Sequence, residues 1–95
     1  MCEKVNNIGW EPEVESEFKL FVAKMPVFHR RIAEQLIREE AQKRAIERNA
    51  TIINEEDFLN AVFDGVPKQF YTLMLRLLKE LKIDYKKYGL PKVNK

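Results

Sequence analysis

Side chains that could do chemistry are few in this sequence. It contains one histidine (His29), one cysteine (Cys2) and one serine (Ser16). No nucleophile lies beside a base along the chain, and a lone cysteine with a lone histidine does not complete a zinc site. The three glycines are isolated, so no glycine-rich loop is present to cradle a phosphate. We therefore expect no catalytic site, no metal site and no bound cofactor, and no enzyme activity from this chain alone.

Length and composition describe one small folded domain over residues 1–95. The chain is 45% hydrophobic and 34% charged, values ordinary for a globular protein. Its net charge of +2 is too small to indicate nucleic-acid binding by itself. The sequence has no signal peptide and no apolar run of 18 residues, so we expect a cytoplasmic protein that does not enter a membrane.

Apolar residues recur at helical spacing through most of the chain and predict an all-α fold. Asn49 is a suitable stop for the second helix, and Asn54 is a suitable N-cap for the third. We predict a compact bundle of four helices over about residues 12–25, 27–49, 55–63 and 67–88, with a loose segment at 1–9 and a tail at 90–95.

The second predicted helix is the longest and should be the central one. Its apolar residues cover more than half of its circumference, which predicts neighbours on more than one side. They are Phe28, Ile32, Ala33, Leu36, Ile37, Ala41, Ala45 and Ile46.

Glu40 falls within this apolar stripe. A carboxylate buried there needs a cation or a hydrogen-bond donor, and Arg44 or the Trp10 indole could supply one. We interpret Glu40 as a buried strut that ties the first two helices together. The alternative is an acid whose pKa is raised by burial, but no second catalytic group can be named for it.

Other polar and aromatic residues allow two interpretations each. Trp10 fits a hydrophobic staple against the first or second helix, or a hot spot for a partner. His29 fits a half-buried position at the start of the second helix, or a contact with a partner or ligand. Basic residues on the second helix fit a solvated face with i,i+4 ion pairs, or a phosphate-binding face. They are Arg30, Arg31, Arg38, Lys43, Arg44 and Arg48.

Several short segments together resemble a known family, the PCP_red domain. The resemblance covers residues 10–63 and leaves the last predicted helix as an addition. Its elements are Trp10-x-Pro12-Glu13-Val14, the run from Met25 through Pro26 and Phe28 to Arg31, Glu40-Ala41, Asn49-x-x-Ile52 and the Asn54 cap.

The PCP_red domain is the small helical domain of light-independent protochlorophyllide reductase, a nitrogenase-like enzyme. That enzyme reduces a ring double bond of a tetrapyrrole with iron–sulfur clusters held by its larger domains. The small domain is an accessory near the pigment site and the subunit contacts. The resemblance thus implies that this chain is a docking or regulatory module, or a reused scaffold. It also implies that any role in an enzyme is that of an accessory part of a reductase complex.

The leading prediction is therefore a non-catalytic module that binds a protein partner or forms a homodimer through its last helix. Two alternatives remain, which are a histone-like DNA-binding protein and a domain that binds a tetrapyrrole or another apolar ligand between helices. The residues expected to matter, mainly as structural determinants, are Trp10, Pro26, Phe28, His29, Arg30, Arg31, Glu40 and Arg44.

Overall fold

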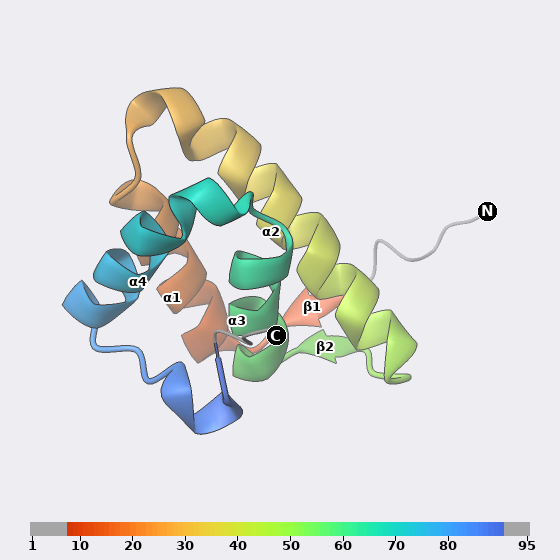
Figure 1. The fold of residues 1–95 in the computed structure, drawn as a ribbon. Coiled ribbons are helices and arrows are strands. Elements are labelled where there is room, and N and C mark those ends of the chain that lie inside the picture. The colour runs from red at the N-terminus through yellow and green to blue at the C-terminus, as the bar shows by residue number, and fades with distance from the viewer. Residues whose placement is uncertain (1–7, 91–95) are drawn as a thin grey trace.

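The structure, a computed structural model, describes residues 8–90 and confirms the all-α prediction (Figure 1). Cys2, residues 1–7 of the predicted loose segment and residues 91–95 of the predicted tail lie outside the described residues. The prediction of a tail is wrong for Leu90, because its side chain is buried in the core. The helices are α1 (Pro12–Ala23), α2 (Val27–Glu47), α3 (Glu55–Asp64) and α4 (Tyr71–Glu80), with strands β1 (Gly9–Trp10) and β2 (Ile52–Ile53) and 3₁₀ turns η2 (Lys68–Phe70) and η3 (Lys86–Tyr88).

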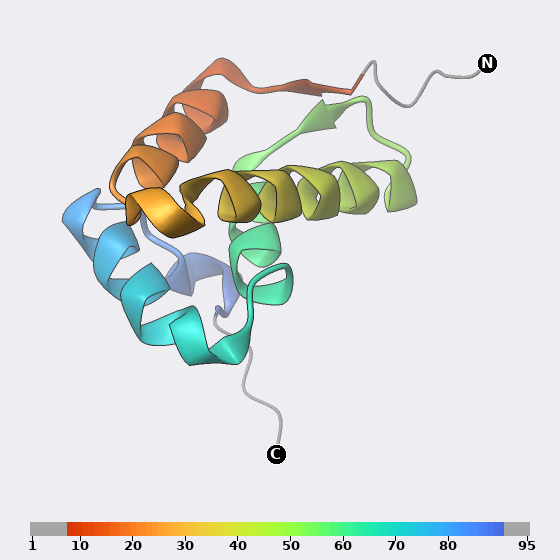
Figure 2. The same ribbon diagram turned by 90° about the horizontal axis from the view of Figure 1, so that it is seen from above.

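Helix α2 is the central element, as predicted. It runs across the molecule, with α1 and α4 near its N-terminal half and α3 packed across it (Figure 2). The side of α2 that faces the hydrophobic core of the protein is lined by alanines and one isoleucine. They are Ala33, Ile37, Ala41 and Ala45, all buried. Small side chains let α3 approach α2 closely, and Gly65 at the end of α3 lies so near that an added Cβ would be 3.2 Å from the Leu36 carbonyl oxygen.

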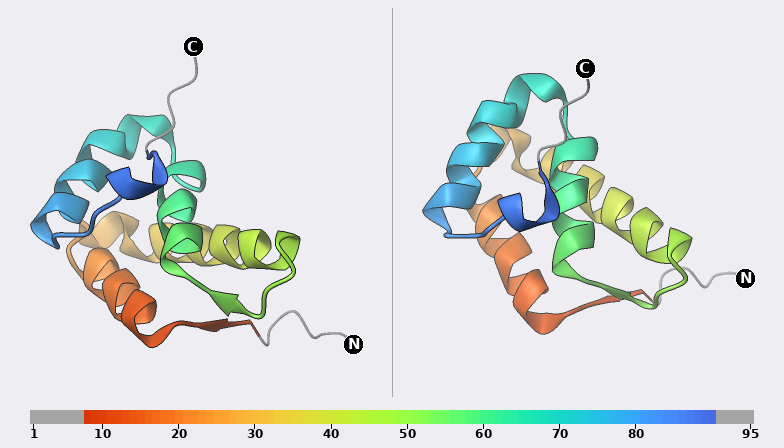
Figure 3. Two further views of the ribbon diagram at one scale, coloured as in Figure 1. Left: turned by 90° about the horizontal axis from the view of Figure 1, so that it is seen from below. Right: turned by 60° about the horizontal axis from the view of Figure 1, so that its bottom comes forward.

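Two short parallel strands close the end of the molecule opposite α4 (Figure 3). Gly9 pairs with Ile52, and Trp10 pairs with Ile53. The Glu11 N–H continues the ladder by donating to the Ile53 carbonyl at 3.0 Å. The prediction of a loose segment is therefore wrong for residues 8 and 9, because Gly9 pairs with a distant segment and Ile8 packs against the core.

The predicted C-terminal end of α2 and the predicted N-terminal start of α3 are confirmed. Asn49 adopts a left-handed conformation with φ of 62°, and the Ala50 N–H returns to the Ala45 carbonyl at 2.9 Å. This is the Schellman arrangement that ends a helix. Asn54 then caps α3, accepting a hydrogen bond from the Asp57 N–H at 2.8 Å while the Asp57 carboxylate accepts one from the Asn54 N–H.

The prediction of a continuous helix over 67–88 is wrong at both ends. Helix α4 follows a 3₁₀ turn, ends at Glu80 and is closed by Lys82 in a left-handed conformation with φ of 60°. Helix α4 ends at Glu80 because of the residues that follow it, since Ile83 and Tyr85 are both buried. Residues two apart point to nearly opposite sides of a helix, so both reach the core only if the chain is not helical there.

Aromatic side chains make up the centre of the core. Phe18 and Phe21 of α1 meet Phe58 of α3 edge to face, with ring centroids 5.8 and 6.0 Å apart. Met74 and Leu78 of α4 belong to the same buried core. Helices α1, α3 and α4 are thus fixed by one core, and α2 lies over it.

Candidate functional site

A row of large apolar side chains on α2 faces away from the core. We define Phe28, Ile32 and Leu36 as the apolar ridge, since residues four apart lie along one line of a helix. Phe28 is 91% exposed and Ile32 is 62% exposed. The wide apolar stripe predicted that α2 has neighbours on more than one side. Within residues 8–90, other elements cover only one side of this stripe. The ridge is the uncovered side.

A groove opens beside the ridge, between the N-terminal half of α2 and the start of α4. It is an almost wholly apolar cavity of about 210 Å³. His29 lies at its edge with its ring centroid 5.4 Å from that of Phe70. The interpretation of His29 as half-buried is wrong, because the first turn of α2 extends past the core and leaves its side chain exposed. The groove is lined by Met25, His29, Ile32, Ala33, Leu36, Val66, Pro67, Phe70, Leu73 and Met74.

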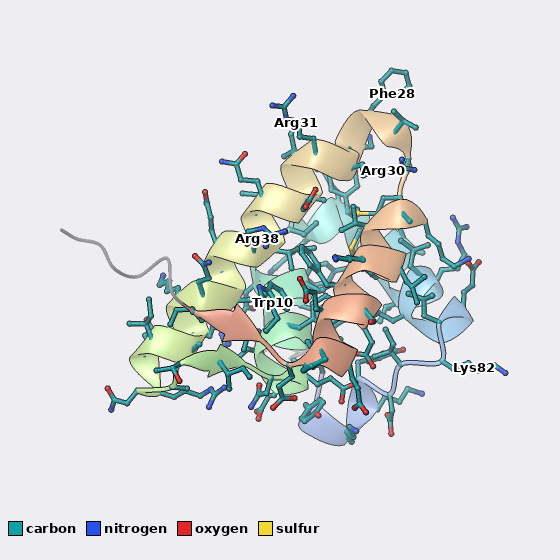
Figure 4. All side chains as sticks on the ribbon, turned by 180° about the vertical axis from the view of Figure 1, so that it is seen from behind. Trp10, Phe28, Arg30, Arg31, Arg38 and Lys82 are labelled. Atoms are coloured by element: carbon teal, nitrogen blue, oxygen red, sulfur yellow. The ribbon has the colours of Figure 1, made fainter. Side chains whose placement is uncertain are left out.

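Arg30 fixes the direction in which the ridge points. Its guanidinium donates to the carbonyl oxygens of Val22 at 3.1 Å, Ala23 at 3.0 Å and Met25 at 2.9 Å. These carbonyls lie at the C-terminal end of α1, where helical partners are missing and a cation is favoured. Pro26 is the N-cap of α2, with φ of −56°, and Phe28 projects from the tip of the molecule (Figure 4).

Trp10 is part of the core rather than of the exposed ridge. Its ring stacks on Phe18 with centroids 4.7 Å apart and meets Phe58 edge to face. The Arg38 guanidinium covers the outer side of this stack, 5.2 Å from the Phe18 centroid. The staple interpretation predicted that Trp10 packs against the first or second helix, and its stacking on Phe18 of α1 agrees with this.

Glu40 is not the buried strut that the sequence suggested. It is half-buried, and no described residue forms an ion pair or a hydrogen bond with it. Arg44 reaches Asp64 of α3 instead, at 3.0 Å. Trp10 lies near Arg38, which is two residues from Glu40 and so faces nearly the opposite side of α2. The predicted pairing of Glu40 with Arg44 was wrong because the sequence of one helix does not show which residues of other helices lie beside it.

Most arginines of α2 are engaged within the chain. Arg38 pairs with Glu34 at 3.0 Å, as the predicted i,i+4 pattern requires, and Arg48 pairs with Asp57 at 2.6 Å. Arg30 caps α1, as described above. Arg31 is exposed and projects from the ridge side of α2 (Figure 4). Most of these arginines therefore form ion pairs or hydrogen bonds within the chain.

A second polar cluster joins α1, α3 and η3, and sequence reasoning missed it. Glu17 of α1 and Glu55 of α3 face each other across a surface hollow. The Tyr88 hydroxyl donates to Glu55 at 2.7 Å, and the Lys87 ammonium lies 3.2 Å from the same carboxylate. The residues are far apart in sequence, so no local pattern could have revealed the cluster.

The cluster shifts the pKa values of its members. Burial, a hydrogen bond with Glu55 and the charge of Glu55 raise the pKa of Glu17 to about 7. Burial acts on Glu55 too, but its hydrogen bonds with Tyr88, Glu17 and Lys87 outweigh it and lower the pKa of that carboxyl. Burial and the hydrogen bond to Glu55 raise the pKa of Tyr88 to about 12. Glu17 is therefore the member that changes charge near neutral pH.

This arrangement predicts a stability that falls as the pH rises. The pKa of Glu17 is raised on folding, so its stabilising contribution is complete below about 4.5 and is lost as the pH passes about 7. Glu17→Gln keeps a donor for Glu55 but cannot ionise. We expect this variant to match the wild type at pH 4.5 and to exceed its free energy of unfolding at pH 8 by about 1–2 kcal/mol, a value reduced for solvent screening.

Thermal melts of both proteins across this pH range test the prediction. Glu13→Gln is the control, since Glu13 is exposed on the same helix beside the same hollow and its charge contributes least to the raised pKa of Glu17. If the wild type and Glu17→Gln keep a constant difference in melting temperature at every pH, the raised pKa of Glu17 is disproved.

Within residues 8–90, no group of three or more His, Cys, Asp or Glu side chains is arranged to hold a metal ion. Nor does any helix in this range have the length and hydropathy of a membrane span. Comparison with known families gives one match, which covers residues 2–90 and so includes α4 and η3.

The chain belongs to the DUF2621 family. Its members are described as proteins of unknown function. No curated protein and no solved structure matches this DUF2621 chain. The apolar ridge and groove and the Glu17–Glu55 cluster are therefore the features on which a function must be argued.

Proposed function

We propose that this DUF2621 protein is a non-catalytic docking module of the cytoplasm that binds a protein through the apolar ridge and the groove. The observation that carries this proposal is the exposure of Phe28 and Ile32 beside an apolar cavity. Isolated exposed apolar residues are ordinary, but a continuous apolar row next to a cavity is typical of an interaction site. The three hydrogen bonds of Arg30 support it, because they hold the ridge in one orientation.

The two alternative functions have less support. A phosphate-binding face needs free cations, and Arg30, Arg38, Arg44 and Arg48 interact within the chain. A cleft for a tetrapyrrole needs more room than the groove offers, since pockets for drug-sized ligands measure about 300–1,000 Å³. The groove, at about 210 Å³, fits one or two side chains better.

The resemblance to the PCP_red domain is consistent with docking and stays a prediction. In that resemblance Pro26, Phe28 and Arg30 form one motif. Arg30 positions the start of α2, and Phe28 is the most exposed large apolar residue in the described chain. The motif would thus preserve a presented side chain together with the group that orients it.

Photo-crosslinking in cells tests the docking function. A photoreactive phenylalanine analogue is placed at Ile32, and a control copy carries it at Ile46, which is similarly exposed on the same helix but lies beyond the ridge. We expect a discrete protein adduct from position 32, identified by mass spectrometry, and none from position 46. The same adducts from both positions, or none from either, would reject the docking function.

A further inference from the structure

We propose that the protein docked on this surface is a second copy of the same chain, with Phe28 of each copy filling the groove of the other across a two-fold axis. This inference rests on the proposed docking function and names its partner. It is argued from the shape of the surface, its size and the charge of the chain.

Shape supports a second copy because the surface carries both a projection and a matching cavity. Phe28 projects from the first turn of α2, and the groove lies within two turns of it on the same side of the molecule. A two-fold interface must contain both halves of every contact on each copy. A partner of another sequence would require only one of them.

Cavity size fits the same occupant. The groove is about 210 Å³ and nearly free of polar atoms, so it suits an aromatic side chain. Filling it would also bury the edges of Phe70 and Leu73, which are only half-buried in one copy. The second, uncovered side of the apolar stripe on α2 would then have the neighbour that its composition predicts.

The exposed area is that of a weak, reversible dimer. Phe28 presents on the order of 150–200 Å², and Val27, Ile32 and Leu36 extend the patch to on the order of 500 Å² per copy. Specific interfaces begin at about 1,000 Å² in total. The net charge of +2 gives little repulsion between two copies. We therefore expect a dimer in the micromolar range of dissociation constants.

Analytical ultracentrifugation over a range of concentrations tests the inference. We expect the wild type to be mainly dimeric at about 100 µM and to dissociate on dilution. Phe28→Asp should weaken the association by about 30-fold or more, as expected for a central contact. Ile46→Asp on the same helix should not weaken it. Circular dichroism checks that each variant is folded, which is expected because both side chains are exposed.

A wild type that is monomeric at about 1 mM would overturn the inference, and so would a dimer that Phe28→Asp does not weaken. Neither result decides the docking function, which the crosslinking from position 32 tests separately. An adduct with a different protein, together with a monomeric wild type, would retain the docking function and reject the second copy as its partner.

Discussion

Asp57→Ala is expected to lower the free energy of unfolding by about 2–4 kcal/mol, a large part of the stability of a small domain. The Asp57 side chain is 5% exposed and pairs with Arg48 at 2.6 Å. It also accepts the Asn54 N–H at the start of α3. Its removal breaks the ion pair between α2 and α3 and half of the capping box in one step.

Urea unfolding followed by circular dichroism measures this effect. Glu56→Ala is the matched control, since Glu56 lies in the same helical turn but is exposed. The control should change the free energy of unfolding by less than about 1 kcal/mol, mainly through the helix dipole. Equal effects of the two substitutions would show that the Arg48 pair contributes nothing specific.

Arg30→Ala is expected to destabilise the protein by about 2–3 kcal/mol because it removes three hydrogen bonds to carbonyl oxygens at and just after the C-terminal end of α1. Arg30→Lys should recover only part of this loss, since an ammonium lacks the planar fork that reaches several oxygens. The effect should also loosen the joint between α1 and α2, which positions Phe28.

Arg31→Ala is the control for Arg30, because Arg31 is adjacent and exposed. Denaturant unfolding should place Arg31→Ala within about 0.5 kcal/mol of the wild type. Backbone amide exchange at Ala23 to Met25 should accelerate only when Arg30 is changed. Unchanged exchange in Arg30→Ala would contradict the proposed capping of α1 by this side chain.

Sequence patterns predicted the features of this fold that depend on nearby residues. Asn49 and Asn54 were identified as helix boundaries because their side chains favour the left-handed and capping conformations. The apolar width of α2 indicated contacts on more than one side, whereas residues 8–90 cover only one of them. The last helix was predicted too long because its polar surface continues past Glu80, whereas burial of Ile83 and Tyr85 determines where the helix ends.

Features that depend on how distant elements meet could not be predicted. The sequence analysis paired Glu40 with Arg44 because the two lie four residues apart. In the structure Arg44 pairs instead with Asp64 at the end of α3. Glu17 and Glu55 come together only when α1 packs on α3. The ridge was within reach of sequence analysis, since Phe28 and Ile32 were in the apolar stripe, but only the structure shows which side of that stripe is left open.

The parallel strands have a consequence for the order of events during protein synthesis. Strand β1 is made before α1 and α2, but its partner β2 is made only after both of these helices. Helices α1 and α2 form through local contacts and can pair early, whereas closing so long a loop is slow and adds an entropic cost. Gly9 and Trp10 therefore stay without their strand partners until Ile52 and Ile53 emerge from the ribosome.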